Sequence, residues 1–129
     1  MGLKINLKPG ERFAINGAVL ENGDRRISLL VKNHASILRQ RDILQPEEVT
    51  TPARHIYFHV MMMYLDPASR AEQGGLFALR LGELLGVLTS PAGIDLCTRI
   101  SEQVMSGALY QALVTCRKLI DFETERLTP

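Results

Sequence analysis

The spacing of apolar residues changes once along this 129-residue chain, and the change divides the chain into two parts. From Leu3 to about Ile43, apolar and polar residues alternate with a period of two. This period is typical of half-buried strands, because successive side chains point to opposite faces. From Thr51 onward, apolar residues recur every three or four positions, as on one face of an α-helix. The sequence therefore predicts an α+β protein: a small antiparallel β module at residues 1–45, followed by a bundle of three or four helices at residues 51–127.

Turn signals divide the β module into four or five short strands of one small sheet. Pro9-Gly10 is typical of a tight turn, and Asn16-Gly17 is typical of a type I′ hairpin or a bulge. Residues 21–24 predict a longer hairpin loop between the second and third alternating runs. The last strand is expected from Ser36 to Arg41, after a looser turn at Asn33-His34. The residues expected to face the core are Leu3, Ile5, Leu7, Phe13 and Ile15.

Positive charge is concentrated in the same β module. Residues 1–44 hold eight Lys or Arg and four Asp or Glu, a net charge of +4, while the rest of the chain has a net charge of −3. Such an asymmetry favours contact between the basic part and a polyanion such as nucleic acid. Solubility is the competing interpretation, because charged side chains on faces and edges protect small sheets from aggregation.

Helix start and stop signals punctuate the second part. Thr51-Pro52 predicts a helix start, with threonine at the N-cap and proline at the first helical position. This helix is expected to end before Asp66-Pro67, because proline restricts the residue ahead of it. Ser69 and Ser90-Pro91 predict the starts of two further helices, and Ser106-Gly107 predicts a break before the last one.

The sequence predicts neither a metal, nor a cofactor, nor an enzyme. His55 and His59 lie one helical turn apart, but the glutamate of a zincin motif and a third ligand are missing, so we expect two partly exposed histidines. Cys97 and Cys116 stand alone on predicted helices, which indicates buried thiols rather than a disulfide. We find no catalytic triad, no paired acids and no cofactor loop. The chain shows no signal-peptide pattern and no membrane-spanning stretch, so we expect a cytoplasmic protein.

Five segments spread along the chain carry a family resemblance. They are LKPGERFAINGAV (7–19), NGDRR (22–26), LRQRDIL (38–44), TPARHIYF (51–58) and MYLDP (63–67). Together they resemble the FlbT family of flagellar biosynthesis regulators. The resemblance implies a post-transcriptional regulator, typically a repressor, that binds the leader region of flagellin mRNA. It also implies a protein partner, the flagellar regulator FlaF, and through it flagellin.

The β module taken alone is similar to the carbon-storage regulator CsrA, a small five-stranded RNA-binding protein. The similarity rests on Lys8-Pro9-Gly10-Glu11 after the first strand and on residues 39–43 at the end of the last. It implies RNA contact through basic residues of the first and last strands, where Lys8 matches one position and Arg39 and Arg41 flank the other. It further implies a homodimer through the β module. The alternative is a monomer in which the helical half covers the sheet.

The predicted RNA-binding residues follow from this charge and this resemblance. Lys4 and Lys8 share the outward face of the first strand. Arg39 and Arg41 are expected to share a face of the last strand, which lies beside the first if the outer strands pair. The full set is Lys4, Lys8, Arg12, Arg25, Arg26, Arg39 and Arg41. The alternative function is that of a protein-interaction adaptor, whose helical half, weakly similar to the flagellin chaperone FliS, holds FlaF or flagellin in a groove.

Overall fold

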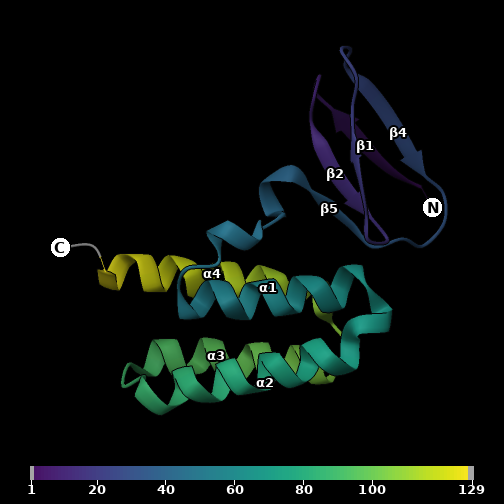
Figure 1. The fold of residues 1–129 in the computed structure, drawn as a ribbon. Coiled ribbons are helices and arrows are strands. Elements are labelled where there is room, and N and C mark those ends of the chain that lie inside the picture. The colour runs from purple at the N-terminus through teal and green to yellow at the C-terminus, as the bar shows by residue number, and fades with distance from the viewer. Residues whose placement is uncertain (1, 128–129) are drawn as a thin grey trace. The chain divides into compact units, whose positions relative to one another are not determined.

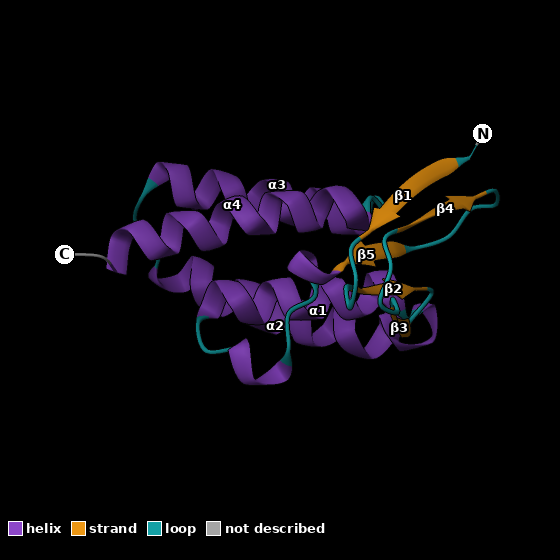
Figure 2. Ribbon diagram, turned by 90° about the horizontal axis from the view of Figure 1, so that it is seen from above, coloured by secondary structure: helices purple, strands orange, loops and turns teal. Residues whose placement is uncertain are grey.

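The computed structural model describes residues 2–127, and the chain divides into two compact units, of which the first ends at Ile43 and the second begins at Leu44. Strands occur only in the first unit and α-helices only in the second (Figures 1 and 2). The predicted α+β class is therefore confirmed.

Five short antiparallel strands build the first unit, called the β unit below. They are β1 (Leu3–Leu7), β2 (Arg12–Ile15), β3 (Ala18–Glu21), β4 (Ile27–Val31) and β5 (Ile37–Arg39). The prediction of one sheet is wrong, because β1 pairs with β4 while β3, β2 and β5 form a second sheet in that order. A shared core joins the sheets: Ile5, Leu7 and Phe13 are buried together, and partly buried side chains from both sheets pack against them.

Two of the predicted turns are confirmed by their backbone geometry. Gly10 has a φ of +72°, and the Glu11 N–H donates to Lys8 O across the turn at 3.1 Å. Asn16 and Gly17 have φ values of +50° and +89° and join β2 to β3 in a tight hairpin. Positive φ at both central residues is what a type I′ turn requires, and asparagine and glycine tolerate it best.

The predicted hairpin at residues 21–24 is wrong, since this loop carries the chain from one sheet to the other. The amide of Asn22 explains the change of direction. Its Nδ2 donates to Lys8 O and to Arg25 O, both at 2.8 Å, so the loop is bound to the end of β1 instead of closing on β3. The Gly10 N–H also donates to Gly23 O at 2.9 Å.

The last strand is shorter than predicted. It ends at Arg39, and residues Gln40–Asp42 form a single turn of 3-10 helix, η1. The side chain of Gln40 accepts a hydrogen bond from the Arg12 N–H at 2.7 Å, and Asp42 is buried. Because the backbone turns at Gln40, Arg39 and Arg41 do not share a strand face, which corrects the prediction.

Four helices build the second unit: α1 (Pro52–Leu65), α2 (Arg70–Val87), α3 (Pro91–Met105) and α4 (Leu109–Leu127). Single 3-10 turns, η2 (Pro46–Glu48) and η3 (Pro67–Ser69), precede α1 and α2. Helix α1 packs against α2 and α4, and α3 packs against α4, whereas α2 and α3 touch much less. Figures 1 and 2 both show α1 beside α2 and α3 beside α4.

The predicted helix boundaries are largely confirmed, but only one predicted cap forms. The Arg54 N–H donates to Thr51 Oγ1 at 3.3 Å, and α1 ends at Leu65 as expected. Ser69 and Ser90 occupy the N-cap positions of α2 and α3 without a side-chain capping bond. The Ser69 hydroxyl donates instead to the carbonyl of Asp66, which already belongs to the preceding turn. Gly107, with a φ of +81°, makes the predicted break before α4.

The core of the helical unit is made mainly by α1, α3 and α4. Its fully buried large side chains are Ile56, Val60, Cys97, Ile100, Leu113, Cys116 and Leu119. Met61 and Met63 are also buried and belong to this core. Both cysteines are free and buried, as predicted, and burial raises the pKa of Cys97 to about 11 and that of Cys116 further.

The histidine prediction needs a correction at one position. His55 is partly exposed, but His59 is buried, and its Nδ1 lies 2.8 Å from Gln73 Oε1 on α2. A polar partner on the neighbouring helix allows this side chain to leave water. Among the described residues, no cluster of His, Cys, Asp and Glu could hold a metal ion.

Candidate nucleic-acid interface

Strands β1 and β4 form a two-stranded ribbon whose two faces differ in chemistry. The pairs Leu3–Val31, Ile5–Leu29 and Leu7–Ile27 lie directly opposite one another. Opposed side chains in an antiparallel pair point to the same face, so all six apolar residues lie on one face. The intervening pairs, Lys4–Leu30 and Asn6–Ser28, lie on the other, which we call the outer face.

The outer face continues past both ends of the paired strands. At one end, a Cβ placed on Gly2 would lie 2.5 Å from Leu30 Cδ1, so Leu30 covers the backbone of residue 2 on this face. One step beyond the last observed pair, Leu3–Val31, the same register would put Lys32 opposite Gly2. At the other end, the Asn22 amide binds the carbonyls of both chain segments and holds them together. The alternation of strand side chains then places Lys8 and Arg26 on the outer face as well.

Arg12 and Arg41 are two of the three predicted RNA-binding residues that form ion pairs within the described part of the chain, and Arg39 is the third. Arg12 Nε lies 3.0 Å from Glu21 Oε1, which is its cross-strand neighbour on β3. Arg41, on η1, lies 3.8 Å from Asp42 Oδ2, although 79% of its side chain is exposed. Each of these arginines therefore has a carboxylate that partly neutralises its charge.

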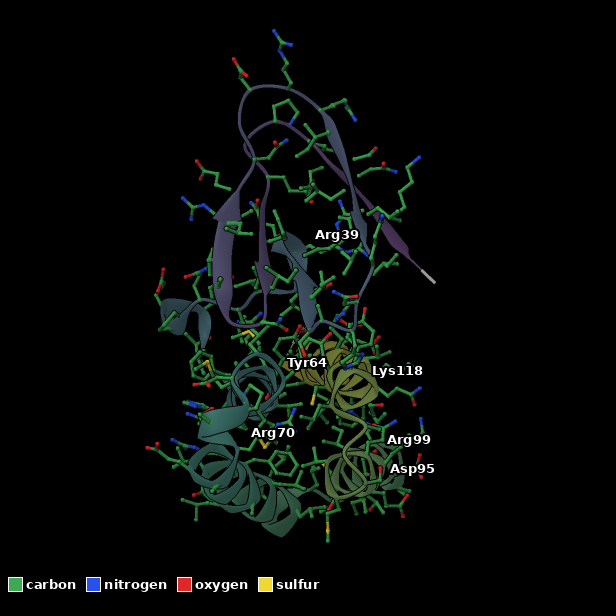
Figure 3. The ribbon with its side chains drawn as sticks, turned by 90° about the vertical axis from the view of Figure 1, so that its right-hand side faces the viewer. Arg39, Tyr64, Arg70, Asp95, Arg99 and Lys118 are labelled. Carbon is green, nitrogen blue, oxygen red and sulfur yellow. The ribbon has the colours of Figure 1, made fainter. Side chains whose placement is uncertain are left out.

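Arg39 is bound more completely than any other predicted residue. Its Nη2 donates to the carbonyl of Asn6 on β1 and to Glu11 Oε2, the latter at 3.0 Å. Glu11 in turn accepts the Lys8 N–H at 2.9 Å. The hydrogen bond from the Lys8 N–H, and after it the one from Arg39, lowers the pKa of Glu11 below its usual value of 4.5. Figure 3 shows Arg39 lying among the strands of the β unit, where it ties β5 to β1 and to the turn at Pro9-Gly10.

Four predicted residues remain as exposed cations: Lys4, Lys8, Arg25 and Arg26. Within residues 2–127, none of these side chains has a carboxylate at ion-pair distance, and the same holds for Lys32. Lys32 was not predicted as a site residue. The period-two alternation of residues 26–32 puts Lys32 on the same face as Arg26. Only the pairing of β4 with β1 brings this face beside Lys4 and Lys8.

The structure therefore does not bring the predicted set together as one surface. Lys4 lies on the outer face of the β1–β4 ribbon, and continued alternation puts Lys8 and Arg26, one residue beyond the paired strands, on the same face. Arg12 and Arg39 belong to the other sheet, and Arg41 lies on η1. The first and last strands do not pair with each other, so the expected neighbourhood of Lys4 and Lys8 with Arg41 does not form.

Within the described part of the chain, no helix is both long and apolar enough to cross a membrane. No solved structure matches the chain. The likeness of the β module to CsrA therefore stays a prediction from sequence.

Comparison with known proteins connects this structure to a flagellar family. The model of the family described as "Flagellar protein FlbT" matches residues 3–127. The flagellum biosynthesis repressor protein FlbT of Caulobacter vibrioides is 54% identical over 127 residues, covering 98% of this chain and 90% of that protein. The probable repressor FlbT 1 of Bradyrhizobium diazoefficiens is 38% identical, covering 95% of this chain and 83% of the relative. A probable repressor of the same name from Brucella abortus is 37% identical, with coverage of 95% and 80%. The chain belongs to the FlbT family.

Proposed function

We propose that this protein regulates flagellin synthesis after transcription, typically as a repressor, by binding the leader region of flagellin mRNA through its β unit. The names of the relatives support a regulatory role in flagellum biosynthesis. The observation that favours RNA is the set of exposed cations without carboxylate partners among the described residues of the β unit, namely Lys4, Lys8, Arg25, Arg26 and Lys32. Nothing in this arrangement suggests an enzyme.

The chemistry of the β unit suits backbone contacts better than base stacking. Proteins that read single-stranded RNA with a sheet commonly stack bases on exposed aromatic rings. The aromatic residue of this unit, Phe13, is buried in the core between the two sheets. Lysine and arginine contacts to phosphates would therefore supply most of the affinity, and hydrogen bonds from strand faces or loops would supply any preference for sequence.

The first prediction is that the purified protein binds a flagellin leader transcript and that salt weakens the binding. Each phosphate contact contributes about 0.7 to the slope of log affinity against log salt for a single strand, so five contacts give a slope of roughly −3.5. Fluorescence anisotropy titrations at several salt concentrations measure this slope. Arg80→Ala on α2 is the control and should leave the slope unchanged, since the helical part carries net negative charge. Absence of binding at low salt would contradict the proposal.

A second candidate function is that of an adaptor that holds FlaF or flagellin through the helical unit. The observation in its favour is one side of α2, where Leu76, Leu79 and Val87 are exposed at spacings that share a helix face. Contiguous exposed apolar surface often marks a protein-binding site. The RNA titration separates the two candidates, because a chain that captures purified FlaF or flagellin but no RNA would be an adaptor alone.

We also propose that the protein forms a homodimer through the β unit. Strand β4 is an edge strand, and its apolar residues Ile27 and Leu29 remain about 40% exposed on the face that buries Ile5 and Leu7. A unit of this size buries little apolar surface by itself, so a second copy would complete its core. Light scattering at micromolar concentration should give twice the monomer mass of 14.4 kDa. A species of 14.4 kDa alone would show that the protein is a monomer.

A further inference from the structure

We propose that single-stranded RNA lies along the outer face of the β1–β4 ribbon, and not along the end of β5. The inference rests on the proposed RNA-binding function and specifies its site. Four cations define this site: Lys4, Lys8, Arg26 and Lys32.

The first argument is the distribution of charge on this face. Its paired positions are residues 4, 6, 28 and 30, and continued alternation extends it to residues 2, 8, 26 and 32; these eight positions hold four cations and no carboxylate. Two residues along a strand span about 7 Å, and paired strands lie about 4.8 Å apart. The cations therefore form two short rows of positive charge. Such rows favour contact with the phosphates of a single RNA strand that lies along the ribbon.

The second argument is that both arginines of the competing site at the end of β5 already have a carboxylate neighbour. Arg39 donates to the Asn6 carbonyl and to Glu11, and Arg41 lies beside Asp42. A phosphate that took Arg39 would have to displace the carboxylate that holds β5 to the turn at Pro9-Gly10. Within the described residues, no ribbon cation has a carboxylate at ion-pair distance, and Lys8 has only a longer-range attraction to Glu11.

The third argument comes from the middle of the face and favours RNA over an anionic membrane. Asn6 and Ser28 lie side by side there, with the Ser28 hydroxyl donating to Asn6 Oδ1 at 2.7 Å. Both groups are exposed and can exchange this bond for hydrogen bonds to base edges. Leu30 is 58% exposed beside them and offers an apolar surface for the face of a base. A lipid headgroup layer would make no use of this central polar pair.

The test compares two double variants that lose the same charge. Lys4→Ala with Lys32→Ala removes two cations from the outer face, and Arg12→Ala with Arg41→Ala removes two exposed cations elsewhere in the β unit. The probe is a mixed-sequence single-stranded RNA oligonucleotide, titrated against wild type and both variants at several salt concentrations. Circular dichroism and thermal melts establish that each variant is folded. Vesicles of phosphatidylglycerol and phosphatidylcholine form a parallel arm.

We expect the ribbon variant to bind RNA more than tenfold more weakly at physiological salt, with the salt slope smaller by about 1.4 because two phosphate contacts are lost. The matched variant should stay within about twofold of wild type, because mutations away from a contact alter only long-range attraction. A ribbon variant that is folded and binds like wild type, or a matched variant that loses as much, would overturn the site while leaving RNA binding intact. A wild type that binds vesicles but no RNA would overturn both the site and the proposed function.

Discussion

Replacing Leu113 by alanine is expected to lower the free energy of unfolding of the helical unit by about 2–5 kcal/mol. Leu113 is completely buried on α4, the helix that packs against both α1 and α3. Truncation removes buried methyl groups and leaves a cavity that these three helices cannot all close. Urea unfolding followed by far-ultraviolet circular dichroism measures the loss, because the helices dominate that signal.

The matched control is Val114→Ala, one position further along α4. Val114 is 39% exposed, so its truncation removes less buried surface than that of Leu113, and alanine has the higher helix propensity. This control should change the free energy of unfolding by less than about 0.5 kcal/mol. Equal destabilisation by both substitutions would mean that α4 does not bury the face assigned to it.

Replacing Asn22 by alanine is expected to destabilise the β unit by roughly 1–3 kcal/mol, because two partly buried carbonyls lose their donor. The Asn22 amide is buried and donates to Lys8 O and Arg25 O. Faster amide hydrogen exchange in β1 and β4 measures the opening of the ribbon, and RNA affinity should fall with it if the outer face is the binding site.

Asn33→Ala serves as the control for this experiment. Asn33 is exposed in the loop after β4, so its truncation removes no buried hydrogen bond. Exchange rates in β1 and β4 should then stay as in the wild type. If Asn22→Ala also leaves them unchanged, its amide is not what holds the end of β1 to the start of β4.

Local patterns in the sequence predicted most elements correctly, for reasons that are themselves local. Proline after Thr51 preset the start of α1, and proline after Asp66 marked its end. The hairpin between β2 and β3 needs a positive φ at two successive positions, and Asn16 and Gly17 are residue types that adopt it readily. Alternation also identified Ile5, Leu7 and Phe13 as core residues, because one face of a short strand must leave water.

Strand partners and side-chain partners depended on contacts between segments far apart in the chain. Nothing in the alternation of β1 distinguishes β4 from β5 as its neighbour, so one sheet was expected where two form. Likewise, a lone arginine such as Arg39 carries no sign that Glu11 and the Asn6 carbonyl will bind it. His59 was expected to be partly exposed because its partner, Gln73, lies on another helix.

The sequence by itself determined the division into strands and helices, the concentration of positive charge in residues 1–44, and the family to which the chain belongs. These properties depend on residue type and near-neighbour spacing, which are visible along one dimension. Only the tertiary structure decided which cations have no carboxylate partner among the described residues and share a face. That outcome depends on strand register, since a single-residue shift of β4 against β1 would put Lys4 and Lys32 on opposite faces of the ribbon.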